Sequence, residues 1–339
     1  MSDGVPAAAV TAAAVRSGGV DALRIVPPGR RGRLLDELRE EVPGAVDDPD
    51  IVDALVDELD YALHPPRHER RVPSYGALVL PTVESDRWSS KTGLGVLIAD
   101  TEVRRDDEVR RYADGLTSWT VRTSSGISSL AVFDRSAGSE RDLVVLATAS
   151  GATVVQRHPG GEVRLVGADG VARWDGIAWH VEPPVLSWLA PSLRASLVDD
   201  DVIVQALRFA VHDLGARGIG AMLVLGFDES SPAGVERRMP KPPALSIVRP
   251  AALGPLRHVL GQIDGASLFD RSGRLLELGV RFVPSERAER EVGPHGGTRH
   301  TTARRISADD PEAVVIVVSE AGPVTVFING EAAGTSPDD

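Results

Sequence analysis

The sequence predicts a protein of the α/β (α+β) class with two domains: a strand-rich N-terminal domain with leading helices, then a C-terminal mixed β-sheet flanked by helices. The chain has 339 residues, of which 42% are hydrophobic, so it can bury two cores. Apolar residues have helical spacing up to about residue 72, and beyond it they occur in short runs between turn signals. All five tryptophans lie at or before position 188, which supports a domain boundary near Pro183 and Pro184.

Residues 1–72 are expected to form a helical N-terminal segment. Apolar residues recur there three or four positions apart in two groups, Leu34, Leu35 and Leu38 and then Val52, Leu55, Val56 and Leu59. Residues 73–185 are expected to form a strand-rich domain, because turn signals such as the Pro-Gly-Gly of 159–161 separate its apolar runs. The expected strands are the runs 76–80, 95–98, 130–133 and 143–148.

Residues 186–332 are expected to form the second domain, and residues 333–339 a tail. The expected elements are, in order, a helix over 202–214, a buried strand over 219–227, a loop over 229–243, a short helix over 255–262, a hairpin over 264–282, a helix over 298–307 and a hairpin over 313–328. This order, αβ, αββ, αββ, gives a mixed sheet with flanking helices.

Composition excludes several classes of function. The chain has no cysteine, which rules out disulfides, thiolate zinc sites and cysteine nucleophiles. The net charge of -12 argues against a sequence-independent nucleic-acid binder, because such binding needs a basic face. No signal peptide or membrane-length apolar stretch is evident. We therefore expect a soluble, cytoplasmic protein without membrane or nucleic-acid partners.

Two short segments carry residue types that nucleotide chemistry needs, and the first is Asp264-Gly265-Ala266, between a helix and an apolar strand. Asp264 is the catalytic candidate, because a carboxylate can hold a metal or accept a hydroxyl proton. Gly265 and Ala266 are small enough for a ligand to lie on the backbone. Taken alone, an Asp-Gly pair at a strand edge is more often a simple turn.

The second segment, from Gly296 to Ala303, has the sequence Gly-Gly-Thr-Arg-His-Thr-Thr-Ala at the expected start of a helix. It indicates a phosphate-binding site, because unpaired N–H groups at a helix N-terminus favour anions. Arg299 can bind phosphate oxygens in a bidentate manner, and Thr298 or Thr302 can donate further hydrogen bonds. An ordinary helix cap with surface charge explains these residues equally well when they are considered alone.

Together these segments resemble the diadenylate cyclase domain, which condenses two ATP molecules into cyclic di-AMP. Such domains carry Asp-Gly-Ala, some thirty residues later Gly-Thr-Arg-His-Arg, then a strand ending in Val-Ser-Glu, and a hairpin. The chain shows the same order at similar spacing in Asp264-Gly265-Ala266, Gly297-Thr298-Arg299-His300, Val318-Ser319-Glu320 and Val324-Thr325-Val326-Phe327. The resemblance covers roughly the stretch 199–330 and implies the diadenylate cyclase fold there.

The resemblance implies a role for each matched residue. Asp264 is implied to bind Mg²⁺ or Mn²⁺ and to activate the ribose 3′-hydroxyl, with Glu320 assisting at the metal. Arg299 and His300 are implied to be catalytic and, with Thr298, to contact the ATP phosphates. The other implied nucleotide-binding residues are Gly265 and Ala266 beside the adenine, and Gly297, Thr301 and Thr302 in the second segment.

The resemblance also implies partners and regulation. ATP is the expected substrate. Because donor and acceptor nucleotides are equivalent, two identical sites facing each other across a twofold axis suffice, which implies a homodimer or higher oligomer. The N-terminal part resembles the soluble sensor domains of the family, and no motif in it names a ligand.

One position departs from the family pattern. Thr301 stands where a second arginine usually follows the histidine, so one positive charge near the phosphates is absent unless Arg304, Arg305 or the metal replaces it. An active cyclase and a catalytically weak or inactive ATP- or cyclic-di-AMP-binding module both remain open. Asp264 favours the cyclase, because a pure binder has less need of a carboxylate beside the reacting hydroxyl. A scaffold without a nucleotide role would make the shared segments a coincidence.

Overall fold

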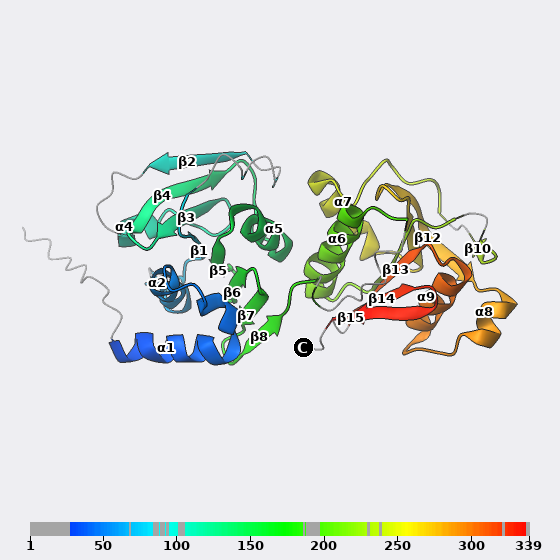
Figure 1. Ribbon diagram of the computed structural model, residues 1–339. Coiled ribbons are helices and arrows are strands. Elements are labelled where there is room, and N and C mark those ends of the chain that lie inside the picture. The colour runs from blue at the N-terminus through cyan, green and yellow to red at the C-terminus, as the bar shows by residue number, and fades with distance from the viewer. Residues whose placement is uncertain are drawn as a thin grey trace, which may run out of the picture.

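The structure is a computed structural model that describes residues 28–67, 69–83, 88, 92, 95–100, 106–185, 187, 197–228, 231–236, 239–320 and 323–336. The described strands form two mixed sheets, one before residue 183 and one after residue 199, and helices cover both. The two domains lie side by side, with α5 and α6 where they meet (Figure 1). The predicted α/β class is confirmed. None of the helices in the described part of the chain combines the length and apolar character needed to cross a bilayer.

The N-terminal sheet has the strand order β2-β4-β3-β1-β5-β6-β7-β8. β1 and β3 are parallel, and the other described neighbours are antiparallel. The strands are β1 (Tyr75–Val79), β2 (Val96–Asp100), β3 (Ser118–Thr123), β4 (Gly126–Phe133), β5 (Thr153–Arg157), β6 (Val163–Gly167), β7 (Gly170–Trp174) and β8 (Trp179–Glu182). The strands predicted at 76–80, 95–98 and 130–133 are confirmed as parts of β1, β2 and β4.

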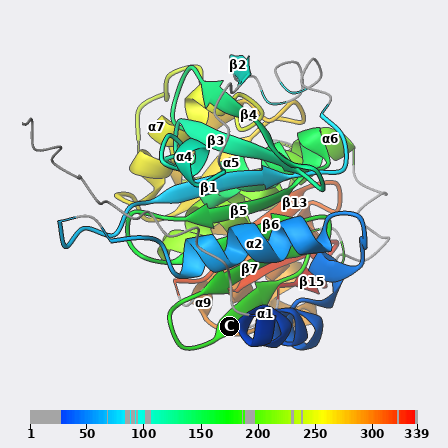
Figure 2. The same ribbon diagram turned by 90° about the vertical axis from the view of Figure 1, so that its left-hand side faces the viewer.

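Helices cover both faces of this sheet. α1 (Pro28–Glu41) and α2 (Val52–Leu63) lie on one face, where Leu38, Leu55 and Leu59 are fully buried in one core with β1, β5 and β6 (Figure 2). The leading helices therefore belong to the same folding unit as the strands. α5 (Glu140–Ser150) covers the other face through Leu143 and Leu146. Shorter helical turns are η1 (Pro43–Val46) and α4 (Asp106–Arg110).

The strand predicted at 143–148 is wrong, because these residues lie inside α5. Ser139 caps the helix, since its Oγ accepts a hydrogen bond from the Asp142 amide at 3.2 Å. Glu140 and Asp142 also place negative charge at the positive end of the helix dipole. Gly151, with a φ of 71°, ends the helix. These start and stop signals outweigh the strand preference of the two adjacent valines.

The C-terminal sheet has the strand order β10-β12-β11-β9-β13-β14-β15. β9 and β11 are parallel, and the other described neighbours are antiparallel. The strands are β9 (Ala221–Leu225), β10 (Gly234–Glu236), β11 (Ala266–Phe269), β12 (Leu275–Val283), β13 (Val314–Val318), β14 (Val324–Ile328) and β15 (Glu331–Thr335). Both predicted hairpins are confirmed, as β11–β12 and β13–β14. β15 extends the sheet into the stretch 333–339, for which the sequence predicts a tail.

Helices pack on both faces of the C-terminal sheet. α6 (Asp200–Phe209) continues into a π-helical turn, η3 (Ala210–Leu214), and a 3₁₀ turn, η4 (Gly215–Arg217), which confirms the helix predicted over 202–214. α7 (Pro250–Leu260) begins at Pro250 rather than at Pro255, because proline suits the first helical turn. α8 (Glu286–Glu291) and α9 (Thr298–Asp309) follow the second hairpin strand.

Side chains of the central strands alternate between two cores. Leu223 and Ile316 lie in the core with α6 and α7, whereas Val224 and Val315 lie in the core with Ile306 of α9. Both faces of β9 and β13 are therefore buried, which is why these strands read as continuous apolar runs.

We expect Ser139→Ala to lower the unfolding free energy of the N-terminal domain by about 1 kcal/mol, because it removes the N-cap of α5. Urea unfolding followed by tryptophan fluorescence measures this effect, since all tryptophans lie at or before position 188. Ser285→Ala is the matched control, because it removes the cap of α8 in the other domain and should leave the fluorescence transition in place. An unmoved transition in Ser139→Ala would contradict the capping role.

Candidate active site

The ends of three adjacent strands meet at one edge of the C-terminal sheet. β9 lies between β11 and β13. Ala266 pairs with Met222 in parallel register, so Asp264 is level with Gly220 just before β9 begins. β13 runs antiparallel and ends at Val318 on the other side of β9. Since neighbouring strands are about 4.8 Å apart, Asp264 and the end of β13, which Glu320 follows, reach the same edge.

Gly220 leaves the space that Arg299 and Glu320 occupy. A methyl group built on Gly220 would lie 2.5 Å from Arg299 Nη1 and 2.7 Å from Glu320 Cγ, which is closer than such atoms can approach. Arg299 also donates a hydrogen bond to the backbone carbonyl of Val318 at 3.5 Å. An arginine from α9 and a glutamate that follows β13 therefore converge over the start of β9.

The Asp264-Gly265-Ala266 segment is a tight backbone junction. Gly265 has a φ of 99°, and a Cβ there would lie 2.8 Å from the Gly279 backbone on β12, so glycine is required. Ala266 is only 2% exposed and faces the core. Asp264 is exposed, and its Oδ1 accepts a hydrogen bond from the Gly265 amide at 2.9 Å. Its second carboxylate oxygen lies at the sheet edge.

α9 begins at the second predicted segment. Gly297 is the N-cap residue and supplies no side-chain cap, so the amides of the first turn keep their capacity to bind an anion. The first turn contains no acidic residue. Thr298 is exposed, and Thr302 lies one turn further along, partly buried. With Arg299 at its start, this end of α9 favours phosphate.

His300 is held by aromatic contacts. Its ring lies 6.3 Å from the ring of His295 and 6.2 Å from that of Phe327, centroid to centroid. Partial burial lowers the pKa of His300, and the nearby His295 and Arg299 lower it further. The imidazole is therefore neutral at physiological pH.

The hydroxyl of Thr301 joins α9 to the loop that precedes it. Thr301 Oγ1 accepts a hydrogen bond from the His295 amide at 3.1 Å and donates one to the His295 carbonyl at 3.3 Å. This hydroxyl is therefore committed to backbone groups. Thr301 positions the glycine-rich loop at the helix start.

The two arginines that could replace the family's second arginine have other partners. Arg304 donates a hydrogen bond to the Gly330 carbonyl at 2.7 Å, and Arg305 donates one to the Val292 carbonyl at 3.3 Å. Both guanidinium groups are therefore engaged with backbone carbonyls. Arg299 Nη1, in contrast, lies beside Gly220 at the sheet edge.

The donor chemistry of the edge fits a hard divalent cation. Asp264 and Glu320 are exposed carboxylates, and oxygen donors are what Mg²⁺ and Mn²⁺ prefer. Among the described residues no group of three carboxylate or histidine ligands forms at this edge. Mg²⁺ commonly binds one or two carboxylates together with substrate phosphates, so the pair suits a metal that arrives with a nucleotide.

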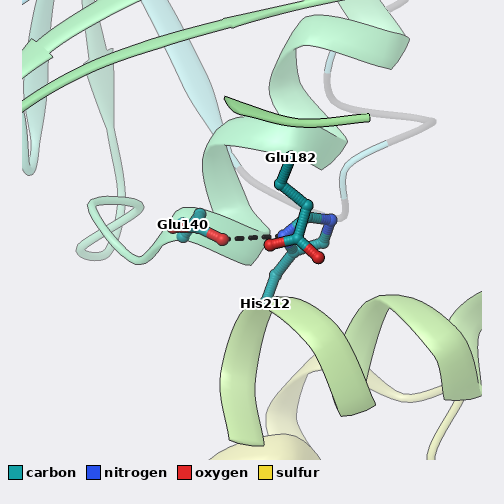
Figure 3. A group of neighbouring side chains, drawn as sticks. All are labelled: Glu140, Glu182 and His212. Atoms are coloured by element: carbon teal, nitrogen blue, oxygen red, sulfur yellow. Dashed lines mark hydrogen bonds and ion pairs between the residues drawn. The ribbon is translucent and has the colours of Figure 1, made fainter. Parts of the chain in front are cut away.

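A second charged cluster lies between the two domains. Figure 3 shows Glu140 from α5, Glu182 from β8 and His212 from η3, whose ligand atoms lie within 4.8 Å of one another. Glu140 is bonded to His212 Nδ1 at 2.7 Å. Arg173 already binds Glu140 at 2.6 and 2.7 Å and Glu182 at 3.0 Å. Because this guanidinium neutralises the carboxylates, the cluster is an ion-pair network and not a metal site.

The sequence-based predictions assign no functional role to Gly220 or to the residues of the Glu140 cluster. The available signal for Gly220 is a glycine at the start of the buried strand expected over 219–227, in the same domain as the two recognised segments. The Glu140 cluster carries no such signal, because Glu140, Glu182 and His212 lie far apart in the sequence and His212 joins the other two only when the domains pack together.

Comparisons with known proteins agree with the two-domain division. The family described as "Probable sensor domain DACNK" matches residues 32–182, and the family described as "DisA bacterial checkpoint controller nucleotide-binding" (DAC) matches residues 208–332. A crystal structure described as a hypothetical membrane spanning protein from Bacillus cereus is 21% identical over 45% of this chain and 67% of that chain, with a TM-score of 0.31. Curated protein sequences gave no match.

The match over residues 208–332 identifies the C-terminal part as a nucleotide-binding domain of the diadenylate cyclase type. Residues 208–332 match the DAC family and residues 32–182 match the DACNK sensor family, so the chain joins a DAC-type domain to an N-terminal DACNK-type sensor domain. The family predicted from the two segments is therefore confirmed. α2 and most of α1 fall within the sensor-domain match.

Thr301→Val should lower the unfolding free energy by about 1 kcal/mol, because valine keeps the shape of threonine and removes both hydrogen bonds to His295. Scanning calorimetry measures the change. Thr302→Val is the matched control, since no comparable bond to the loop is present at that position in the described residues. An equal effect of the two substitutions would contradict the role assigned to the Thr301 hydroxyl.

The Glu140 cluster makes stability depend on pH. Burial opposes ionisation of Glu140, but hydrogen bonds from Arg173 and His212 outweigh it and lower the pKa from 4.5 to about 2. A carboxyl group whose pKa is lower in the folded than in the unfolded protein stabilises the fold fully at pH values above its pKa in the unfolded state. This contribution is lost as the pH falls through its pKa in the folded state. The shift corresponds to about 3 kcal/mol at neutral pH.

Glu140→Gln should therefore destabilise the protein most at neutral pH, and its difference from the wild type should shrink as the pH falls from 4.5 toward 2. Urea unfolding at a series of pH values measures this difference. Glu286→Gln, at an exposed carboxylate whose ion pair is 3.9 Å long, is the control and should have little effect. A deficit for Glu140→Gln that stays constant down to the lowest pH would contradict the assignment.

Proposed function

We propose that the protein is a diadenylate cyclase, which condenses two ATP molecules into cyclic di-AMP and two pyrophosphates under the control of its sensor domain. The observation that supports this most is the approach of Arg299 and Glu320 over Gly220, at the edge that also carries Asp264. One edge thus offers a proton acceptor, a phosphate-binding cation, a helix end that favours anions and carboxylates for a metal.

In the proposed reaction the 3′-oxygen of one ATP attacks the α-phosphorus of the other. The new O–P bond forms while the bond from the α-phosphorus to the pyrophosphate oxygen breaks, so pyrophosphate leaves. Asp264 accepts the hydroxyl proton, and Arg299 with the first amides of α9 stabilises the charge that develops on the phosphates. The same step with the roles exchanged closes the ring.

Mg²⁺ or Mn²⁺ bound through Asp264 and Glu320 would supply Lewis acidity at the reacting phosphate. The residues of the chain do the positioning. Thr298 and the neutral imidazole of His300 can each donate a hydrogen bond to a phosphate oxygen. The contacts of His300 with His295 and Phe327 fix its ring before the substrate arrives.

A cavity of about 430 Å³ lies over β11 and β12, large enough for a nucleoside, and its Met239 wall approaches this edge. Met239 and Leu268 give it apolar walls, and Lys241 adds a cation. A methyl group built on Gly279 would lie 3.1 Å from Met239 Sδ and 3.5 Å from the carbonyl oxygen of Asp264, so the cavity adjoins the catalytic segment. We assign the adenine to this cavity.

Each copy of the chain binds one ATP in this scheme, so the reaction needs a second copy. Donor and acceptor are chemically equivalent, and two copies related by a twofold axis present them to each other. The proposed active form is therefore a homodimer or a higher oligomer with facing edges.

A catalytically weak nucleotide-binding module is the second candidate. It is favoured by Thr301, which supplies no charge, and by Arg304 and Arg305, which are bonded elsewhere. One cation fewer at the departing pyrophosphate lowers transition-state stabilisation more than it lowers affinity for ATP.

Asp264→Asn should reduce cyclic di-AMP formation at least about 100-fold, because the amide cannot accept the hydroxyl proton. The fold should persist, since the side chain is exposed and its Oδ1 can still accept from Gly265. Purified full-length protein is incubated with ATP and Mg²⁺ or Mn²⁺, and the products are identified by mass spectrometry.

Glu286→Gln is the matched control, because it changes an exposed carboxylate of α8 and should leave the rate unchanged. Full activity of Asp264→Asn would remove Asp264 from the mechanism. Wild-type protein that binds ATP in calorimetry but forms no product would support the binding module instead.

A further inference from the structure

A polar cavity of about 540 Å³ lies between the sensor domain and the cyclase-type domain. Its walls are the first turn of α5 and the loop before it on one side, and η3, η4 and the first turns of α7 on the other. The volume is in the range of sites that hold a small metabolite. Five arginines line the cavity: Arg135, Arg141, Arg164, Arg217 and Arg257.

The cavity has an excess of positive charge. Three carboxylates line it as well, so the arginines exceed them by two. One of these carboxylates, Glu140, is neutralised by Arg173, and another, Asp213, lies 2.7 Å from Arg257. Arg217 is exposed and makes no ion pair within the described residues. Arg164 is paired with Glu162 at 2.6 Å, so Arg141 and Arg217 are the cationic groups that remain most available to a ligand.

Arg141 provides a second, independent observation. It is only 5% exposed, and its Nε has no hydrogen-bond partner within the described part of the chain. The nearest carboxylate oxygen, on Asp213, is 3.9 Å away. Burial lowers the pKa of Arg141, as expected for a guanidinium whose charge is only partly compensated. A buried donor in a cavity wall is what an anionic ligand would satisfy.

The pKa of His158 also indicates positive charge around the cavity. Partial burial lowers the pKa of His158, and the charges of Arg164 and Arg217 lower it further. The histidine that lines the cavity on the sensor side is therefore neutral at physiological pH, and it can donate to or accept from a ligand.

We propose that this cavity binds a small, multiply charged oxyanion, which is the input of the sensor domain. Guanidinium groups bind phosphate and carboxylate oxygens in the same planar geometry, so phosphate-bearing and carboxylate-bearing metabolites share this chemistry. The regulatory part rests on the proposed cyclase function, whereas the binding part does not.

Two elements that wall the cavity run directly into the candidate active site. η4 ends at Arg217, and Gly220 follows almost at once, with Arg299 and Glu320 above it. α7 starts at the cavity and ends at Leu260, shortly before Asp264. A ligand that draws the domains together would therefore displace both halves of the site through short connections. η3, a π-helical turn of the kind often found at functional sites, carries the interdomain bond to Glu140.

Binding is tested by calorimetry on the full-length chain at low salt, with inorganic phosphate in one arm and citrate in the other. We expect the wild type to bind at least one of these anions, and Arg217→Gln to weaken binding about tenfold or more by removing an uncompensated cation. Arg290→Gln, at an exposed arginine of α8, is the matched control and should bind like the wild type. The stronger arm identifies the anionic group that the cavity prefers.

The Arg299→Gln variant distinguishes anion binding in this cavity from anion binding at the active-site edge, which can also bind phosphate. Binding that survives Arg299→Gln and is lost in Arg217→Gln assigns the anion to the cavity. The reverse pattern, or no binding of either anion by the wild type, overturns the proposal. Circular dichroism of each variant verifies the fold, and Arg217 is exposed, so its substitution leaves the core intact.

The regulatory part is tested with the same anion in the ATP assay. The anion should change the wild-type rate of cyclic di-AMP formation several-fold and leave the Arg217→Gln rate nearly constant. Equal responses of the two proteins would overturn the regulatory part while leaving the binding result in place. A wild type without any cyclase activity would instead count against the proposed function, because the binding assay requires no turnover.

Discussion

The register of β9 between β11 and β13 is the constraint on which the candidate active site depends. Parallel pairing starts β9 and β11 at the same sheet edge, so Asp264 and Gly220 are level. Antiparallel pairing ends β13 at that edge and delivers Glu320 to it. A slip of one residue would exchange Met222 and Leu223 between two differently shaped cores, so packing maintains the register. The apolar cores thereby determine where the exposed charges lie.

The same edge combines residues without side chains and charged groups that need space. Gly265 lies too close to the Gly279 backbone to carry a Cβ, and Arg299 and Glu320 occupy the space that a side chain at Gly220 would need. Arg299 lies at the start of α9 and Glu320 follows the end of β13, so a different element holds each charged group. A nucleotide can therefore approach the backbone closely while cations and carboxylates reach it from two directions.

Much of the C-terminal domain was predictable because its signals are local. The two hairpins and α9 follow from apolar runs, turns and a glycine-flanked helix start, and the Asp264 segment stands out by its residue types. α5 was mispredicted because adjacent valines resemble a strand, although Ser139 and Gly151 mark a helix. The space above Gly220, the bonds of Thr301 and the Glu140 cluster could not be predicted, since they depend on contacts between segments distant in the sequence.

The polar character of the domain interface is consistent with control of the reaction by small displacements. Arg141 donates to Gln205 at 2.8 Å, and Arg208 donates to Thr148 at 3.4 Å, so hydrogen bonds as well as apolar packing join the domains. Interfaces of this kind permit relative motion more readily than an apolar core does. An allosteric coupling of about 1–3 kcal/mol is enough to change a rate several-fold or more. Because η4 and α7 end beside the reacting groups, such a coupling needs no long pathway through the cyclase-type domain.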